Sequence, residues 1–292
     1  KLDKSLTDLR IATNGTYEET AKLLSSYTKL GKQLGATTKE VADSADSWLR
    51  QNKTLAETNT LVQDSMILSK LGQIDSANAT QYLTSATKGY NVAVKDSIGI
   101  VDKLTAVDIQ SATSAGGLAE AMSKVANLAN MSGVSMDKLL GYLALVGEVT
   151  QKNMSEVGNS FQTIFARLGN IKVNKFIDDE TGDDLSQVES VLSKLGVNLR
   201  DTQGNFRNFG DVLDEIGGKW KSFSNIEQSA IGVAISGVRN RENFNVLMNG
   251  YGKALEYAGV SANSSGNAMK KFEAYQDSVE SKTKKLTATL EG

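Results

Sequence analysis

The sequence predicts a mainly α fold, a multi-helix bundle of helical hairpins with one small β-hairpin near residues 197–209. Three observations lead to this prediction. Apolar residues recur at spacings of three and four over most of the 292 residues, which places them on one face of successive α-helices. Capping boxes precede several of these runs. The chain also contains no proline, the residue that most strongly interrupts a helix.

The apolar period marks helices of ordinary length rather than one long rod. We expect a helix over each stretch in which the period is clear: Tyr17–Leu34, Met136–Leu143, Met154–Leu168, Leu185–Leu195, Val212–Phe223 and Phe244–Leu255.

Capping residues and glycines are expected to separate these helices. A Ser/Thr-x-x-Glu box satisfies two free backbone N–H groups at a helix start. Such boxes occur at Thr16/Glu19, Thr37/Glu40, Thr54/Glu57, Ser186/Glu189 and Ser224/Glu227. Glycine adopts the left-handed conformation that commonly ends a helix. We expect helix ends at Gly35, Gly72, Gly133, Gly169 and Gly196.

Gly141, Gly147 and Gly158 lie inside helical runs, where each costs up to about 1 kcal/mol relative to alanine. The usual compensation is the close approach of another helix, and a loop at some of these positions is the competing explanation. Trp48 and Trp220 follow the helical period, so we expect both to pack in the core.

One segment breaks the helical pattern. Residues 197–200 and 206–209 alternate between apolar and polar side chains, and a five-residue loop containing Gly204 separates them. This pattern is typical of a β-hairpin, which at this size needs helices packed on it.

The chain divides into three expected regions. Residues 1–110 would form N-terminal helical hairpins, and residues 111–265 a helical core with the small β-hairpin. Residues 266–292 would form a long amphipathic helix that leads into the rest of a longer parent chain. Its apolar seam includes Met269, Phe272, Tyr275, Val279, Leu286 and Leu290.

Composition argues against most enzyme classes. Without His or Cys, the chain cannot build a Ser-His-Asp triad, a Cys-His pair, an imidazole or thiolate zinc site, or a disulfide. Its net charge of −2 gives no general basic field for specific nucleic-acid binding. The longest strongly apolar stretch, Leu139–Val146, is far below the roughly 18 residues of a membrane span.

Two local motifs are candidates for chemistry. The acidic run Ile177–Asp184 fails the calcium-loop pattern, because counting from Asp178 places Gly182 at position 5 instead of 6. Ser-x-x-Lys, in which a lysine can activate a serine, begins at Ser26, Ser85 and Ser135, but its companion motifs are absent. We therefore predict no enzymatic activity, no catalytic, cofactor-binding or metal-binding residues, and no cofactor.

Four ordered stretches resemble the tail tape measure proteins of long-tailed bacteriophages and prophages. They are Leu118–Ala144, Val146–Arg167, Leu195–Leu213 and Arg241–Leu255. The resemblance covers at least residues 110–290 and extends more loosely to the N-terminus.

The resemblance implies a structural virion protein that sets tail length and templates tail-tube assembly in the tail lumen, after synthesis in the bacterial cytoplasm. The implied partners are the tail tube protein, tail assembly chaperones and tail-tip proteins, with self-association also possible. If wholly helical, the chain would span about 440 Å. The short, glycine-ended helices instead predict a folded segment of such a protein. Two alternatives remain: a helical adaptor or secreted effector module without enzymatic activity, and a peptidoglycan hydrolase.

Overall fold

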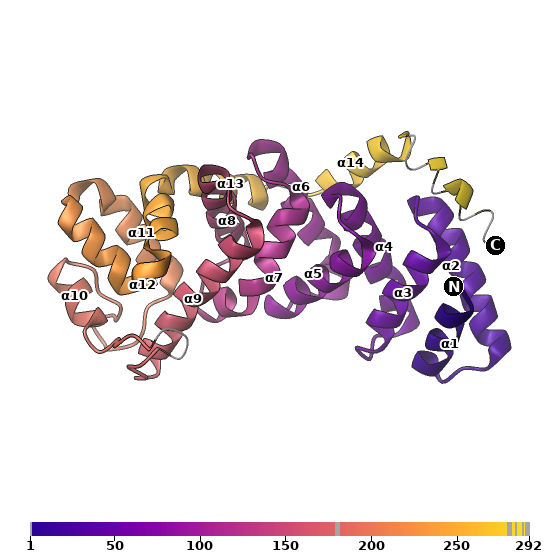
Figure 1. Ribbon diagram of the computed structural model, residues 1–292, viewed down its shortest axis with the longest axis horizontal. Helices are drawn as coiled ribbons and strands as arrows, with labels where there is room; N and C mark the ends of the chain where they lie inside the picture. Colours follow the sequence, from indigo (N-terminus) through magenta and orange to yellow (C-terminus); the bar gives the residue numbers. More distant parts are fainter. Residues whose placement is uncertain (1, 179–181, 279–281, 284, 288, 290–292) are drawn as a thin grey trace.

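The protein is mainly α-helical, as the sequence predicts. The computed structural model describes residues 2–178, 182–278, 282–283, 285–287 and 289 (Figure 1). The α-helices within these residues are α1 (Leu2–Thr13), α2 (Tyr17–Leu34), α3 (Thr38–Leu49), α4 (Leu55–Gly72), α5 (Ser76–Gly89), α6 (Ile98–Gln110), α7 (Ala115–Met131), α8 (Met136–Thr150), α9 (Met154–Lys172), α10 (Val188–Lys194), α11 (Phe209–Lys219), α12 (Asn225–Asn249), α13 (Tyr251–Ala262) and α14 (Asn267–Gln276). Two short 3₁₀ helices, η1 (Val94–Asp96) and η2 (Trp220–Ser222), adjoin α6 and α11.

The first nine helices form a two-layered array. Helices α1, α3, α5, α7 and α9 pack on one another in chain order, and α2, α4, α6 and α8 form the second layer beside them. The result is an elongated row of helices, with α1 to α3 at one end and α10 to α12 at the other (Figure 1). Each hairpin therefore completes its core against its neighbours along the row, as in helical repeat proteins.

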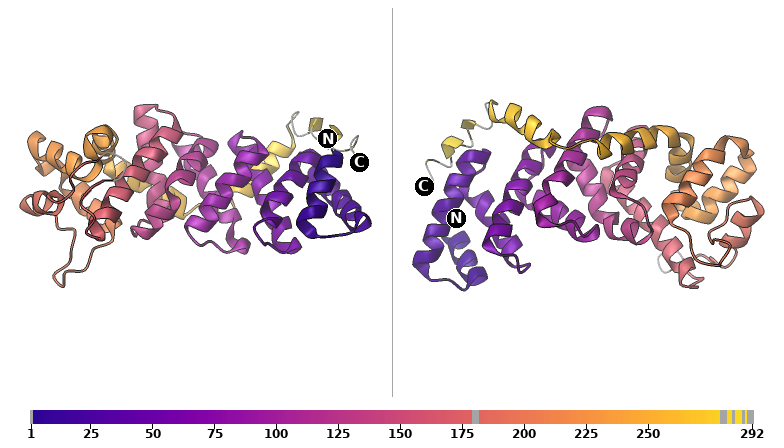
Figure 2. Two further views of the ribbon diagram at one scale, coloured as in Figure 1. Left: turned by 60° about the horizontal axis from the view of Figure 1, so that its bottom comes forward. Right: turned by 180° about the vertical axis from the view of Figure 1, so that it is seen from behind.

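The chain then turns back along the array. Helix α13 packs on α8 and α6, and α14 packs on α6 and α4. We call α13 and α14 the return segment; Figure 2 shows it running along the row toward α2. At its end the Gln276 side-chain amide donates to the Gln33 backbone carbonyl over 2.9 Å.

Glycines allow the helices of this array to approach closely. A Cβ atom at Gly141 of α8 would lie 2.2 Å from the Ala254 carbonyl oxygen of α13. A Cβ at Gly158 of α9 would lie 2.6 Å from the Ala121 carbonyl oxygen of α7. The expected close approach of another helix is thus confirmed at both positions. At Gly147 the close neighbour is the sulfur of Met154, at the start of α9.

Four of the five predicted glycine helix ends are confirmed. Gly35, Gly133 and Gly196 follow their helices with φ of 66°, 74° and 75°. Gly72 is the last residue of α4, where it lies against the Gly116 backbone, but the left-handed conformation is taken by Gln73 instead. The prediction is wrong at Gly169, because α9 continues for three more residues to Lys172.

Capping boxes start four helices as predicted. They form at Thr16/Glu19, Thr37/Glu40, Thr54/Glu57 and Ser224/Glu227. The fifth box, at Ser186/Glu189, does not form. The Glu189 carboxylate instead accepts from the Arg200 guanidinium over 2.9 Å, and the Ser186 backbone N–H donates to Asp184. A long-range ion pair therefore replaces the local cap.

The predicted β-hairpin near residues 197–209 is wrong. The described residues contain no strand, and this segment holds one isolated antiparallel bridge, between Arg200 and Phe206. The turn itself is present, because the Asp201 carboxylate accepts from the backbone N–H groups of Gln203 and Asn205. Helix α11 begins at Phe209, so the chain enters a helix before a ladder can grow.

The core is continuous along the array. Buried apolar side chains from Leu9 to Phe272 form one cluster, and the expected boundaries at residues 110 and 265 stay predictions. Trp48 and Trp220 are buried, as expected, and donate their indole N–H groups to Ser65 and Asn249.

The expected C-terminal helix is described only in part. Helix α14 ends at Gln276, while Val279 and Leu290, expected on its apolar seam, lie outside the described residues. Within the described part of the chain, no helix combines the length and apolarity needed to cross a membrane.

Candidate interaction groove

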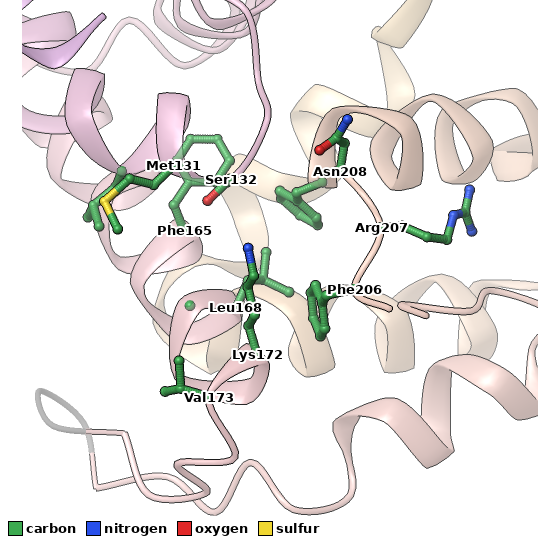
Figure 3. Close-up of a pocket in the computed structure, with 12 residues that line it drawn as sticks. Met131, Ser132, Phe165, Leu168, Lys172, Val173, Phe206, Arg207 and Asn208 are labelled. Carbon is green, nitrogen blue, oxygen red and sulfur yellow. The ribbon is translucent and has the colours of Figure 1, made fainter. Parts of the chain in front are cut away.

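An apolar groove lies where helices α7 and α9 end side by side. Gly158 of α9 contacts Ala121 of α7, so the two helices run in parallel and finish at the same edge of the array. Residues 206–209, which lead into α11, close the third side (Figure 3). The groove thus collects residues from three elements that are distant in the sequence.

The walls of the groove are mainly apolar. Leu128, Phe165 and Leu168 line it together with Phe206 and Phe209. Phe165 and Phe209 meet edge to face, with ring centroids 5.7 Å apart, which fixes the wall between α9 and α11. The cavity volume of about 210 Å³ is on the scale of one large side chain.

Two exposed apolar side chains flank the groove. Met131 is 68% exposed at the end of α7, and Val173 is 69% exposed just after α9. Figure 3 shows Met131 and Val173 on the α7 and α9 side of the groove and Phe206 opposite. An apolar hollow with exposed apolar edges is typical of a contact site for another protein.

Two charged residues, Lys172 and Arg207, line the groove. The Arg207 guanidinium donates to the Glu215 carboxylate over 2.7 Å and to the Asn198 carbonyl oxygen over 2.8 Å. These bonds hold the loop before α11 in place. Lys172, in the last turn of α9, complements the negative end of that helix dipole. The groove is therefore a prearranged apolar surface with Lys172 at its rim.

Sequence reasoning did not identify this groove. The sequence predicts Phe206 and Phe209 in the β-hairpin and Leu168 on the apolar face of a helix. The sequence did contain one signal of an exposed apolar side chain, because Met131 lies beyond the last apolar turn of α7. That signal indicates a groove only when the elements beside Met131 are known.

The acidic run packs on a buried arginine. Arg167 is 3% exposed, and its guanidinium lies 2.7 Å from the Asp183 carboxylate and 3.8 Å from that of Asp178. Asp178 is itself buried, so this pairing compensates its charge. Residues 179–181 of the run lie outside the described residues. The described residues contain no group of three or more acidic side chains arranged to hold a metal ion.

The Ser-x-x-Lys serines make backbone hydrogen bonds. The hydroxyls of Ser26 and Ser85 donate to the carbonyl oxygens of Leu23 and Gln81. Ser135 accepts from the backbone N–H of Lys138 as the N-cap of α8. The Lys138 ammonium group pairs with Asp214 over 2.6 Å.

A partly buried chain of polar side chains joins α8, α11 and α13. The Tyr251 hydroxyl donates to the Asp214 carboxylate over 2.7 Å and lies 2.9 Å from the Tyr142 hydroxyl. Burial, the neighbouring Tyr142 and the hydrogen bond to Asp214 raise the pKa of Tyr251. Both phenols therefore stay protonated near neutral pH and act as donors, which suits a structural clamp between helices.

Comparison with known proteins supplies the family. No solved structure matches the chain. The sequence model of the family described as "Phage-related minor tail protein" matches residues 24–237, which span well over half of the chain and include every residue that lines the groove. The chain therefore belongs to the phage-related minor tail protein family.

Proposed function

We propose that this chain is a folded helical segment of a tail tape measure protein, which sets tail length and templates tube assembly. It acts through shape and contacts, without catalytic chemistry, inside the tail lumen of the virion. Its partners in this role are the tail tube protein, the assembly chaperones and the tail-tip proteins.

The observation that carries the proposal is the family match over residues 24–237 in a chain that is mainly helical. The ordered resemblance of Leu118–Ala144 and Val146–Arg167 to tape measure proteins narrows it to that role. The absence of His and Cys from the whole sequence favours a structural role over a hydrolase.

Electron microscopy of virions tests the ruler role. In a phage whose tail gene encodes this chain, in-frame deletion of an extended helical segment outside the array should shorten the tail by about 1.5 Å per residue. Deletion of α7 should instead prevent assembly, because nine of its residues are buried. Unchanged tail length after the first deletion would exclude a ruler and favour the adaptor alternative.

The groove between α7, α9 and residues 206–209 is the contact site that we propose for another tail protein presenting a large apolar side chain. Met131→Glu and Val173→Glu place charge on exposed edges, so we expect stability to change by no more than about 0.5 kcal/mol. We also expect fewer complete tails. Val149→Glu is a matched control, because Val149 is 57% exposed and lies outside the groove. Equal tail yields from all three variants would exclude the groove as a contact site.

A further inference from the structure

Helix α14 is fastened to the array by a carboxylate from another helix. Its N-cap is Gly266, in the left-handed conformation with φ of 79°, and this residue has no side chain to cap the helix. The Asp102 carboxylate of α6 takes over, accepting from the backbone N–H groups of Gly266 over 3.0 Å and Ala268 over 2.7 Å. A negative charge at a helix N-terminus stabilises the helix.

Two further residues of α14 make polar contacts with α6, and Gln276 at its end contacts Gln33 of α2. The Asn267 amide donates to the Thr105 hydroxyl over 2.8 Å. The Lys271 ammonium group donates to the Thr105 carbonyl oxygen over 3.2 Å and lies 3.4 Å from the Asp108 carboxylate. One face of α6 therefore binds three groups of α14: its N-terminal backbone N–H groups, the Asn267 side-chain amide and the Lys271 ammonium group.

The apolar part of this contact is small. Two of the ten residues of α14, Ala268 and Phe272, are buried, whereas α7 buries nine of seventeen. Phe272 stacks on Tyr275 of its own helix, with ring centroids 5.7 Å apart. Because few apolar groups hold it, α14 needs less free energy to detach than the core helices do.

We propose that α6, together with α4, carries a helix-binding site whose resident is α14, and that α14 of a second copy of this chain takes this site when the resident detaches. The hinge is the segment before α14, where Gly266 supplies the conformational freedom. The second copy is the occupant that fits, because the Asp102 cap and the Thr105 and Asp108 contacts already match this helix. Exchange of an identical element between copies adds no new contact type and therefore costs little.

The lack of native cysteine makes local detachment measurable. Thr105→Cys places a thiol at a fully buried position that contacts α14. Ser160→Cys places one at a buried position of α9, remote from α14, and reports global unfolding. Both variants are labelled with a small maleimide under native conditions. The labelling rates compare detachment of α14 with global unfolding.

We expect the Cys at 105 to react at least about tenfold faster than the Cys at 160, since tenfold corresponds to about 1.4 kcal/mol. Phe272→Ala in the same chain should accelerate labelling at 105 and leave labelling at 160 unchanged. Lys271→Ala, a milder change at a side chain that is 30% exposed, should act in the same direction. Equal rates at 105 and 160 in all backgrounds would overturn the proposal, because α14 would then open only with the whole core.

Exchange is tested by mixing two differently tagged single-cysteine copies, Thr105→Cys and Asn267→Cys. If α14 of one copy reaches α6 of the other, oxidation gives a mixed disulfide-linked dimer whose yield rises with concentration. A mixture of Ser160→Cys and Asn267→Cys is the collision control. A mixed dimer that does not exceed this control, even with rapid labelling at 105, would overturn the second copy as occupant.

Discussion

Gly141 and Gly158 lie where two helix backbones approach too closely for a methyl group. At both positions the nearest atom to an added Cβ is a backbone carbonyl oxygen, which cannot move without moving its helix. Sequence reasoning identified the unusual glycines from their cost in a helix interior. It could not identify their neighbours, because Ala254 lies more than a hundred positions from Gly141 along the chain.

Gly141→Ala should therefore destabilise the fold. The added methyl group would force α13 away from α8, at a cost of about 1–3 kcal/mol from overpacking. Gly259→Ala is the matched control, since Gly259 lies inside α13 with no atom within 4 Å of an added Cβ. That change should stabilise by about 0.4–1 kcal/mol. Urea unfolding of both variants measures the difference, and equal midpoints would contradict the close approach.

Asp64 should make the folded protein less stable as pH rises. A salt-bridged acid, whose pKa is lowered in the folded state, has the opposite effect. Burial raises its pKa from 3.8 to about 6, Ser97 donates a hydrogen bond that lowers it, and the Asp102 charge raises it again. The folded state thus binds the proton more tightly than the unfolded state. This group's contribution to the unfolding free energy is greatest below about pH 4 and falls as pH rises to about 6, by at most about 3 kcal/mol.

Asp64→Asn removes the titrating group while keeping an oxygen for Ser97. Between pH 4 and pH 7.5, the unfolding free energy of the variant should rise relative to that of the wild type. Urea unfolding at each pH measures it. An identical pH dependence in the two proteins would show that Asp64 titrates normally.

At the scale of elements, the local signals in the sequence succeed at four of the five capping boxes. Thr16, Thr37, Thr54 and Ser224 cap their helices with their Glu partners. Glu40 keeps its box although the Lys70 ammonium group lies 3.6 Å from its other carboxylate oxygen. Glu189 instead pairs with the Arg200 guanidinium over 2.9 Å, and the expected cap is lost. The alternating residues around Phe206 form only one bridge, to Arg200, because α11 begins three residues later at Phe209.

The kink of α12 is a further tertiary feature that the helical period cannot predict. Gly237 has φ of 70° and ψ of 171° inside α12, a combination that is essentially restricted to glycine. The Arg167 guanidinium carbon lies 3.3 Å from where its Cβ would be. The kink thus brings the α12 backbone against the buried arginine that holds Asp178 and Asp183.

Gly237→Ala should destabilise by at least about 1–3 kcal/mol through backbone strain. Gly218→Ala in α11 is the matched control, because no atom lies within 4 Å of an added Cβ there, and it should stabilise by about 0.4–1 kcal/mol. Thermal unfolding compares them. A variant at 237 that is as stable as wild type would mean that α12 can straighten.

For the whole molecule, the length of the folded row of helices does not follow from the number of residues, because the chain turns back along the row. The row of helices extends from α1 to α12, but the return segment brings Gln276 back to Gln33 of α2. Residues added to a loop of this fold therefore do not lengthen the row of helices. The sequence predicted a folded segment from its short helices, but the return path depends on contacts such as Asp102 with Gly266, which join residues far apart in the chain.

Under the proposed tape measure role, this geometry predicts different effects of two insertions on tail length. About 30 Gly/Ser residues placed between Asn52 and Lys53, in the loop joining α3 and α4, should leave tail length unchanged, because loops of this kind tolerate insertion without altering the packed array. The same number of residues added as helix to an extended segment outside the array should lengthen the tail by about 45 Å. Electron microscopy of the two phages measures both lengths. Tails lengthened equally by the two insertions would mean that this region acts in the tail as an extended chain and not as the folded array.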